Sequence, residues 1–419
     1  MKRTIVRAAS GLAAVAALHA PLSASAQDAA LLGAAKAAQP GVVDTLKALV
    51  AIESGSANVA GLARMADYAE RRLQALGART ERTKASPGPG AAILKATFEG
   101  AGQRRILLLA HMDTVYPQGI LATQPIREEA GRLYGPGIAD DKGGIAVILH
   151  SLEILHARGW KDYARLTVLL NPDEEIGSIG SGEAIAALAA EHDVVLSCEP
   201  TAAKAIAKTE GLLLGAAGTA TATLEVAGRQ SHAGAAPDLG RNALIELAHR
   251  LVQMRDVGKS VPGAQLNWTT AQSGLVRNQI PDKAVAGGDV RLFERDAAER
   301  LKAALEAKAA EPGLVPDTRT SVTLVVGRPP YRADERGRAI AERAKAIYAE
   351  LDGRPLALAP MTGGATDAGY ASRSGKAAVV ESFGLAGFGY HARDEYVELD
   401  SIVPRLYLMT RLLTELGRR

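Results

Sequence analysis

Histidines and acids stand directly after apolar runs in this sequence, where a folded chain could gather them. The apolar run Ile106 to Ala110 leads into His111 and Asp113, and the run Leu166 to Leu170 leads into three consecutive acids. A third run, Val194 to Leu196, leads into a further acid, and two glycine-rich loops carry an acid and a histidine. The side chains collected in this way are His111, Asp113, Asp140, Glu174, Glu175, Glu199 and His391.

Imidazole and carboxylate groups without a thiolate form a donor set that zinc, cobalt and manganese accept. A carboxylate can bridge two such metals about 3.5–4 Å apart, and the pair lowers the pKa of a shared water toward neutrality. A further carboxylate outside the ligand set is then needed to take the proton from that water. Each motif alone also fits an ordinary helix cap, acidic helix start or turn. Their joint occurrence after strands favours a metal centre that activates water.

The composition is that of an ordinary globular protein, with 47% hydrophobic and 23% charged residues in 419. It argues against collagen, disorder and coiled coil. The formal net charge of +3 falls to zero without the first 26 residues, which hold three bases and no acid. A neutral chain has no bulk electrostatic attraction to nucleic acid or to an anionic membrane, so we expect neither partner. The single cysteine, Cys198, excludes an intramolecular disulfide and a cysteine-rich zinc site.

Residues 1–26 have the pattern of a cleavable secretory signal. Three basic residues precede an uncharged apolar run from Ala8 to Leu18, and small residues follow up to Ala26, as a signal peptidase requires. The apolar run is too short to span about 30 Å of hydrocarbon, which argues against a membrane anchor. We predict a signal peptide at 1–26, cleavage after Ala26, and a secreted protein in a bacterial periplasm.

The residues that could do chemistry need a scaffold that brings several strand ends together. Short buried runs alternate with amphipathic segments such as Gly144 to His156 and Gly182 to Glu191. This alternation predicts an α/β fold with a largely parallel sheet. Ligands of such sheets bind outside the carboxyl ends of the strands, which is where His111, Glu174 and Glu199 would lie.

A different pattern interrupts this alternation. From about Leu214 the order strand, helix, two strands, helix, strand predicts a small α+β domain of ferredoxin-like type. The α/β pattern resumes near Tyr331 with a helix, a buried strand and a closing helix. We therefore predict one α/β domain in two parts, at 27–213 and 329–419, with an inserted domain at 214–328 between them.

The segments HMDTV, GPGIADDKGG, PDEEIGS, CEPT and GFGYHA occur in this order along the chain. Together they resemble the M20 family of di-zinc peptidases, and within it the glutamate carboxypeptidases of the G2 type. The likeness runs nearly from end to end of the chain. It implies a zinc-peptidase-like α/β catalytic domain, an inserted lid and dimerisation domain, a homodimer, and two zinc ions in each subunit.

The resemblance also implies a role for each residue of the metal centre. His111 and Glu199 would hold one zinc ion, Glu175 and His391 would hold the other, and Asp140 would bridge the two. In this family the peptide bond that follows the bridging aspartate is cis.

Further residues match positions that act on the substrate. Glu174 would be the general base, and Asp113 would bond the far nitrogen of His111 and fix its tautomer. His232 would stabilise the oxyanion, in several members of the family from the opposite subunit. Arg328 would grip the α-carboxylate of the substrate, and Asn278 would face the substrate. The glycine loop that lines the pocket would contain Gly363 and Gly364.

The implied activity is hydrolysis of the amide bond to a C-terminal amino acid, with glutamate favoured. Folate-like compounds, N-acyl-glutamates and short peptides with a free C-terminal carboxylate are the implied substrates. One position departs from the family. Where glutamate carboxypeptidases carry a lysine just before a Leu-x-Leu-Gly strand, this chain has Glu210-Gly211. Lys208, shortly upstream, is the candidate cation for an acidic side chain.

Other functions are open on the same residues. An aminoacylase, a deacetylase or a dipeptidase of the same family would share every metal ligand, and only contacts in the substrate pocket separate them. A non-catalytic binding protein on this fold would have lost a ligand or Glu174, and none is lost. A nucleotide-binding oxidoreductase is excluded, because the loop Gly135 to Asp140 lacks the third glycine of the dinucleotide fingerprint.

Overall fold

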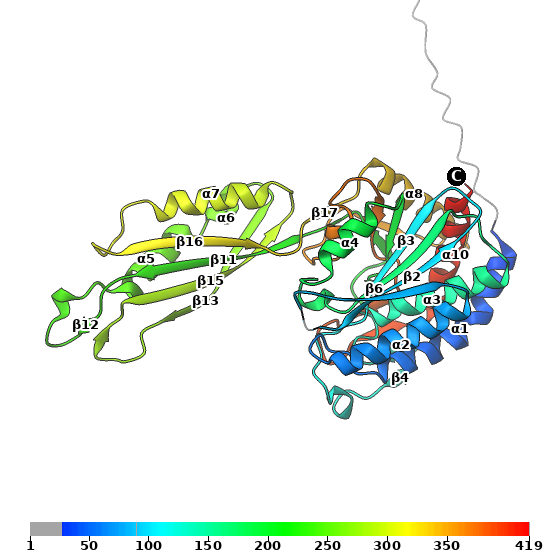
Figure 1. Ribbon diagram of the computed structural model, residues 1–419, viewed down its shortest axis with the longest axis horizontal. Coiled ribbons are helices and arrows are strands. Elements are labelled where there is room, and N and C mark those ends of the chain that lie inside the picture. Colours follow the sequence, from blue (N-terminus) through cyan, green and yellow to red (C-terminus); the bar gives the residue numbers. More distant parts are fainter. Residues whose placement is uncertain (1–26, 89, 419) are drawn as a thin grey trace, which may run out of the picture.

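The computed structural model describes residues 27–88 and 90–418, so the predicted signal segment 1–26 lies outside the described residues. A larger α/β unit, here called the body, and a separate sheet, here called the inserted sheet, lie side by side (Figure 1). Each has its own cluster of buried apolar side chains. The prediction of an α/β fold is confirmed.

A six-stranded mixed sheet forms the centre of the body. Its strands follow the order β1-β2-β6-β3-β7-β19. The four strands from β6 to β19 are parallel, whereas β1 and β2 join the sheet antiparallel. Their bounds are β1 Arg79–Lys84, β2 Ala92–Glu99, β3 Arg105–His111, β6 Arg165–Asn171, β7 Val194–Ser197 and β19 Ala378–Val380.

Helices pack around this sheet and bury its inner strands, whereas the edge strand β1 is exposed. In β3 every residue after Arg105 is buried, as continuous apolar runs require when both faces of a parallel sheet are covered. Helices α1, α3 and α10 contact one another, and α8 packs on β19. Helices of the body are α1 Ala29–Val50, α2 Val59–Ala75, α3 Lys142–Ala157, α4 Gly182–Ala189, α8 Glu335–Ala349, α9 Ala368–Ala371 and α10 Ile402–Gly417.

Short strands form smaller sheets beside the central sheet, and one pair of them, β12 with β14, belongs to the inserted part of the chain (Figure 1). One small sheet has the order β4-β5-β21-β20-β8, and three pairs, β9 with β18, β10 with β17 and β12 with β14, stand apart. Their bounds are β4 Arg127–Glu129, β5 Arg132–Tyr134, β8 Thr201–Ala202, β9 Gly211–Leu213, β10 Gly215–Ala216, β12 Ser231–His232, β14 Gln279–Ile280, β17 Tyr331–Arg332, β18 Ala357–Ala359, β20 Ala386–Phe388 and β21 Tyr396–Glu398.

The inserted sheet is antiparallel, with the strand order β13-β15-β11-β16. Alternate residues of β11 are buried, because helices α5 and α7 pack on one face of the sheet. Bounds are β11 Gly218–Ala227, α5 Ala243–Met254, α6 Val257–Ser260, β13 Ala264–Ser273, β15 Lys283–Leu292, α7 Ala297–Ala309 and β16 Arg319–Val326.

Two chain segments join the inserted sheet to the body, and they are bonded to each other. The backbone N–H of Thr219 donates to the carbonyl of Arg328, and the N–H of Gly327 donates to the carbonyl of Thr219. Leu214 and Ala216 still belong to the core of the body, and Ala220 is the first residue in the core of the inserted sheet. The change of core therefore comes a few residues after Leu214, while the predicted domain boundaries stay a prediction.

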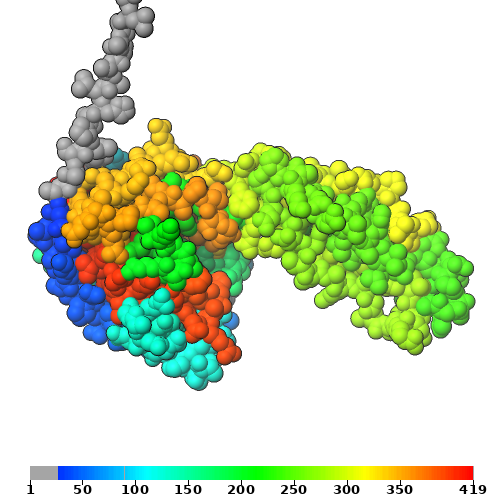
Figure 2. Space-filling view, turned by 180° about the vertical axis from the view of Figure 1, so that it is seen from behind, coloured from blue at the N-terminus to red at the C-terminus, as the bar shows by residue number. Residues whose placement is uncertain are grey.

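The inserted sheet projects from one side of the body (Figure 2). Strand β12 lies at its end farthest from the body (Figure 1). In the part of the chain that the structure describes, no helix has the length and apolarity that a membrane span needs. Cys198 is fully buried in the body, directly after β7.

Candidate metal centre and substrate cavity

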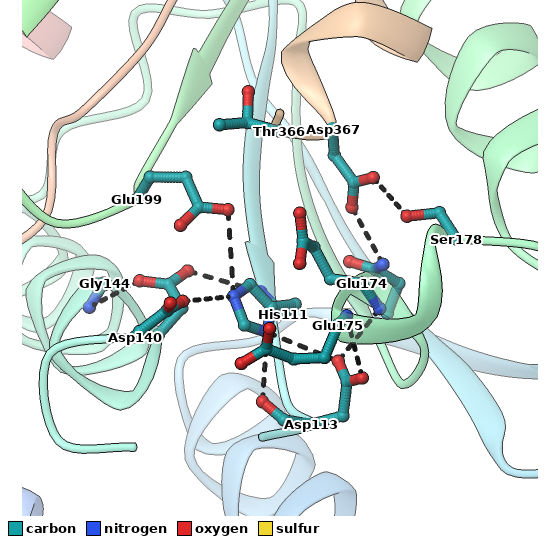
Figure 3. Close-up of polar contacts among 12 residues, drawn as sticks. His111, Asp113, Asp140, Gly144, Glu174, Glu175, Ser178, Glu199, Thr366 and Asp367 are labelled. Carbon is teal, nitrogen blue, oxygen red and sulfur yellow. Dashed lines mark hydrogen bonds and ion pairs between the residues drawn. The ribbon is translucent and has the colours of Figure 1, made fainter. Parts of the chain in front are cut away.

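Parallel strands bring the predicted metal-site residues to one edge of the central sheet. His111 is the last residue of β3, Glu174 and Glu175 follow β6, and Glu199 follows β7. Since β3, β6 and β7 are parallel, their carboxyl ends meet at the same edge. Figure 3 shows the side chains from these strand ends converging.

The predicted ligands form two groups that share one aspartate. His111, Asp140 and Glu199 offer ligand atoms that lie within 4.8 Å of one another, and so do Asp140, Glu175 and His391. The Nε2 atom of His111 is 2.9 Å from an oxygen of Asp140 and 3.7 Å from one of Glu199. The Nε2 atom of His391 is 3.4 Å from the other oxygen of Asp140 and 3.0 Å from Glu175.

The charges of these groups fit divalent cations. Burial raises the pKa of Glu199 well above its ordinary value, and the neighbouring Asp140 and Glu174 add to that rise. Burial likewise raises the pKa of Glu175. Metal ions placed between the carboxylates would remove this penalty, and the two nitrogen and three carboxylate ligands suit zinc. The donor set therefore fits two metal ions bridged by Asp140.

Asp113 contacts both His111 and the segment that carries Glu174 and Glu175. Its carboxylate accepts hydrogen bonds from the backbone N–H groups of Glu174 and Glu175, at 3.0 and 3.1 Å. The hydroxyl of Ser56 donates to it at 2.7 Å. One of its oxygens lies 3.3 Å from Nδ1 of His111, and Asp113 is fully buried. This contact leaves Nε2 of His111 facing Asp140 and Glu199.

The loop that carries Asp140 is fixed from the opposite side by Glu395. The buried carboxylate of Glu395 accepts hydrogen bonds from the N–H groups of Gly137, Ala139 and Asp140, at 2.8 to 3.0 Å. The hydroxyl of Tyr116 also donates to it, at 2.7 Å. The peptide bond after Asp140 is cis, as the resemblance implies.

Glu174 stands beside the two groups and is not a member of either. Its carboxylate is 2.7 Å from the guanidinium of Arg328, and both side chains are buried. Burial raises the pKa of Glu174 to about 8, although Arg328 and His111 pull it down. Arg328 also donates to the carbonyl of Ala365 at 2.8 Å and lies 3.7 Å from Asp367. A proton acceptor and a strong anion-binding group are thus adjacent next to the metal centre.

A cavity of about 930 Å³ opens onto this centre. Asp140, Glu174, Glu175, Glu199 and His391 line it. The predicted substrate residues Arg328, Gly363 and Gly364 also line it. Lys208 is exposed and is not among the lining residues, although its neighbours Ala207 and Thr209 are.

His232 and Asn278 lie elsewhere. His232 belongs to β12, at the far end of the inserted sheet (Figure 1), and neither residue lines the cavity. They are neighbours, because the N–H of Ala233 donates to the carbonyl of Asn278 at 2.9 Å. The Nδ1 atom of His232 accepts hydrogen bonds from the N–H groups of Gly234 and Ala235. In the neutral ring the proton then sits on Nε2, which makes Nε2 a donor.

Several buried residues of the site were not among those predicted from the sequence. Asp367, within 3.7 Å of Arg328, accepts a hydrogen bond from Asn171 at 2.8 Å and another from Ser178. Glu395, which holds the Asp140 loop, lies four residues after His391. Asp367 is the last residue of the glycine loop that the resemblance implies, 362–367, and its place in that loop is the available signal for it. For Glu395 no local pattern existed, because its donors come from a loop about 255 residues earlier.

The sequence also matches known proteins. Residues 107–415 match the family model of peptidase family M20/M25/M40. Carboxypeptidase G2 of Pseudomonas sp. is 42% identical over 392 residues, which cover 93% of this chain and 93% of that protein. Succinyl-diaminopimelate desuccinylase of Stenotrophomonas maltophilia is 30% identical over 335 residues, which cover 75% of this chain and 85% of that enzyme.

Solved structures share the fold. Aminopeptidase PepT from Bacillus cereus superposes with a TM-score of 0.74 at 21% identity, covering 90% of this chain and 98% of that one. An M20 family metallo-carboxypeptidase from Sulfolobus solfataricus gives a TM-score of 0.72 at 18% identity, with 90% and 99% covered. The family model spans most of the chain, and a relative with 42% identity matches almost all of it, so the chain belongs to peptidase family M20/M25/M40.

Proposed function

We propose that this protein is a secreted zinc-dependent carboxypeptidase that hydrolyses the amide bond to a C-terminal amino acid. The observation that carries the proposal is the pair of ligand groups joined by Asp140, with Glu174 and Arg328 in contact beside them. His111 and Glu199 would hold one zinc ion, Glu175 and His391 would hold the other, and Asp140 would be a ligand common to both groups. The likeness to Carboxypeptidase G2 supports the same activity.

The residues divide the reaction among them. Zinc ions bound there would polarise the scissile carbonyl and lower the pKa of a bound water. Glu174 takes the proton from that water and passes it to the leaving amine. Arg328 binds the α-carboxylate of the substrate, a task that suits its planar, bidentate guanidinium. Since Glu174 and Arg328 are in contact, the bound carboxylate lies next to the base and sets the position of the scissile bond.

A second subunit completes the site in this proposal. His232 and Asn278 are far from the cavity of their own chain, so they serve the cavity of a partner in a homodimer formed through the inserted domain. The Nε2–H of His232 is the donor that a developing oxyanion needs. Exposed apolar residues on helix α5 of the inserted domain, Leu244, Ile245 and Val252, support an interface there.

The prediction from the sequence includes a preference for glutamate as the C-terminal residue of the substrate. The sequence predicts glutamate, with folate-like compounds, N-acyl-glutamates and peptides as substrates, and it offers Lys208 as the cation. An acidic side chain needs such a cation beside it when it leaves water. Lys208 is exposed outside the cavity lining, so the glutamate preference stays a prediction without its expected partner.

Another hydrolase of the same family is the second candidate. The desuccinylase relative, like the deacetylase of Myxococcus xanthus at 31% identity over 58% of this chain, carries a different specificity in its name. An aminoacylase, a deacetylase or a dipeptidase would keep the metal centre and Glu174. These activities differ from that of a carboxypeptidase only in the contacts that the protein makes with the α-carboxylate and with the side chain of the substrate.

Release of a free amino acid from N-acyl and dipeptide substrates tests the proposal. The mature chain, starting after Ala26, is assayed as purified, after treatment with a chelator, and after zinc is added back. We expect release that the chelator abolishes and zinc restores. C-terminal amides of the same substrates should react poorly, because they have no carboxylate for Arg328. Equal rates for acids and amides would favour a different hydrolase of the family.

Secretion is part of the proposal and has its own test. The pattern of residues 1–26 supports export to a bacterial periplasm. N-terminal sequencing of the protein recovered from the periplasm of an expressing bacterium should begin at Gln27. An intact Met1 in that fraction would contradict cleavage.

A further inference from the structure

We infer that the cavity receives a neutral, mainly apolar C-terminal side chain, and that it discriminates against glutamate. This inference rests on the proposed carboxypeptidase function and concerns the same cavity. It starts from one part of the cavity lining, here called the side wall. The side wall consists of strand β9 (Gly211–Leu213), Ala357 and Ala359 of strand β18, and Ile206, Ala207 and Thr209 before β9.

The side wall is mainly apolar, and its two strands are paired. Strands β9 and β18 pair in parallel, with Gly211 beside Ala357, Leu212 beside Leu358 and Leu213 beside Ala359. Glu199 lines the same cavity as the side wall, so the wall and the metal centre border one space. Thr209 supplies the one hydroxyl among the side-wall residues. A methyl or methylene group on the substrate would leave water for this surface, which is favourable.

The acid next to the side wall faces away from the cavity. Glu210 is buried, and it is not among the residues that line the cavity. The hydroxyl of Tyr348 and the guanidinium of Arg354 each donate to its carboxylate at 2.6 Å, and Nε of Arg405 lies 3.0 Å from it. Glu210 is therefore paired with Arg354 and Arg405, and neither arginine lines the cavity. None of these charges is available to a substrate.

Lysines close to the side wall in sequence do not line the cavity either. Lys208 is exposed and does not line the cavity. The amine of Lys204 pairs with Asp400 on the outer surface. Gly211, which does line the cavity, has no side chain at all. The side wall thus offers no cation to the substrate among the residues that the structure describes.

Two arginines line the cavity outside the side wall. Arg328 is assigned to the α-carboxylate, which every C-terminal residue carries. Arg291 belongs to β15 of the inserted sheet, and its guanidinium is held by Asp289 through two contacts, at 3.0 and 3.3 Å. A glutamate side chain against the side wall would give up its hydration without gaining an unpaired cation.

Four substrates with one acyl group test this inference on the zinc-loaded mature chain. Their C-terminal residues are glutamate, its neutral analogue glutamine, and the apolar methionine and leucine. We expect kcat/KM for methionine and leucine to exceed that for glutamate by ~10-fold or more, with glutamine in between. Glutamate cleaved as fast as glutamine or faster would overturn the inference. No release from any of the four would instead contradict the proposed function.

The variant Gly211→Lys tests whether the side wall is the surface that reads the side chain. A Cβ at Gly211 would lie 3.0 Å from the carbonyl oxygen of Ala357, so the wall must give slightly in any variant. Gly211→Met has the same Cβ and a similar length without the charge, and it is the matched control. We expect the ratio of kcat/KM for glutamate to that for leucine to rise ~10-fold in Gly211→Lys relative to Gly211→Met. Equal ratios in the two variants would overturn the inference.

The variant Arg291→Gln tests whether the other arginine that lines the cavity binds an acidic side chain of the substrate. If the side wall determines the preference for an apolar side chain, Arg291→Gln leaves the ratio of kcat/KM for glutamate to that for leucine within about twofold of the unmodified chain. A ratio that falls ~10-fold would mean that Arg291 binds the acidic side chain, which would overturn the inference.

Discussion

Glu174 is the acid at the centre of the proposed chemistry, and its closest ionic partner is Arg328. Replacing it with glutamine keeps the shape of the side chain and removes the proton acceptor. We expect Glu174→Gln to lose turnover by ~10²–10⁴-fold, the range of general acid–base catalysis, while both zinc ions remain bound. Steady-state kinetics and metal analysis of the same sample measure the two effects. Glu183→Gln, an exposed acid paired with Arg373, is the control and should keep full activity.

Glu395 controls the metal centre through the backbone. Its carboxylate collects the N–H groups of Gly137, Ala139 and Asp140, so glutamine in its place would turn an amide NH₂ toward one of these donors. We expect Glu395→Gln to weaken zinc binding by about 10–100-fold, as for other outer partners of metal ligands. Competition with a zinc-binding dye measures the affinity. Glu398→Gln, which alters a buried acid that does not contact the Asp140 loop, should bind zinc normally.

Some residues of the site could be recognised from the sequence, and others could not. His111, Glu175 and Glu199 were predictable because each follows an apolar run, and a strand places the residue after it at the sheet edge. Glu395 was not, because its role depends on donors brought from a distant loop. Lys208 was assigned from distance along the chain, and a turn of the backbone leaves it exposed outside the cavity lining.

At the scale of elements, the direction of each strand decides what it can contribute. Strands β3, β6 and β7 are parallel and place their last residues at the metal centre. Strand β2 has the same apolar character but runs antiparallel to β6, so its end points to the other edge. An apolar run in the sequence predicts that a strand exists. The direction of that strand relative to its neighbours depends on the connection between them, which the run itself does not show. The central sheet is largely parallel, as predicted, and β2 is the strand that runs the opposite way.

Helices α1, α2 and α3 meet at His150, whose protonation should affect stability. Nε2 of His150 is 2.8 Å from the hydroxyl of Thr45 and 3.2 Å from Arg72, and Glu153 lies 3.2 Å from Nδ1. Burial, with the nearby Arg72, lowers the pKa of His150 to about 4. Between pH 6.5 and 4 the imidazole of His150 is protonated in the unfolded chain and stays neutral in the folded chain. Its contribution to the free energy of unfolding is therefore complete above pH 6.5 and is lost as the pH falls to 4.

The expected loss from His150 is about 2 to 3 kcal/mol of unfolding free energy between pH 7 and pH 4. His150→Gln should reduce the pH dependence of stability in this range by that amount. Urea unfolding at several pH values measures it. His156→Gln, at an exposed position on the same helix, should follow the unmodified chain. Parallel curves for the unmodified chain and His150→Gln would contradict the assignment.

At the scale of the whole molecule, the inserted sheet separates residues that the proposed reaction needs together. The cavity of one chain holds Glu174, and the far end of the inserted sheet holds His232. His232→Ala alone should lower kcat by ~10²–10³-fold, the usual loss for an oxyanion donor. The sequence predicted the residue, but its distance from the cavity became visible only in the folded chain.

Mixed dimers test whether His232 acts on the partner subunit. Glu174→Gln chains still carry His232, and His232→Ala chains still carry Glu174, so a dimer with one of each contains one intact site. Random exchange of equal amounts should restore about a quarter of the original activity. The measurement is kcat before and after the two inactive variants are unfolded and refolded together. Activity that stays at the mean of the two parents would contradict a site shared between subunits.

The burial of Cys198 makes the chain a convenient host for optical and magnetic probes. This thiol is the only one in the sequence, it is fully buried, and burial raises its pKa well above the ordinary value. Thiol reagents attack the thiolate, so Cys198 should remain unlabelled in the folded protein. Cysteines introduced at the exposed positions Lys302, on helix α7 against the inserted sheet, and Glu335, on helix α8 of the body, would be the sole reactive pair. Fluorescent dyes or spin labels on that pair would report the distance between the two units in solution, with no background from the native chain.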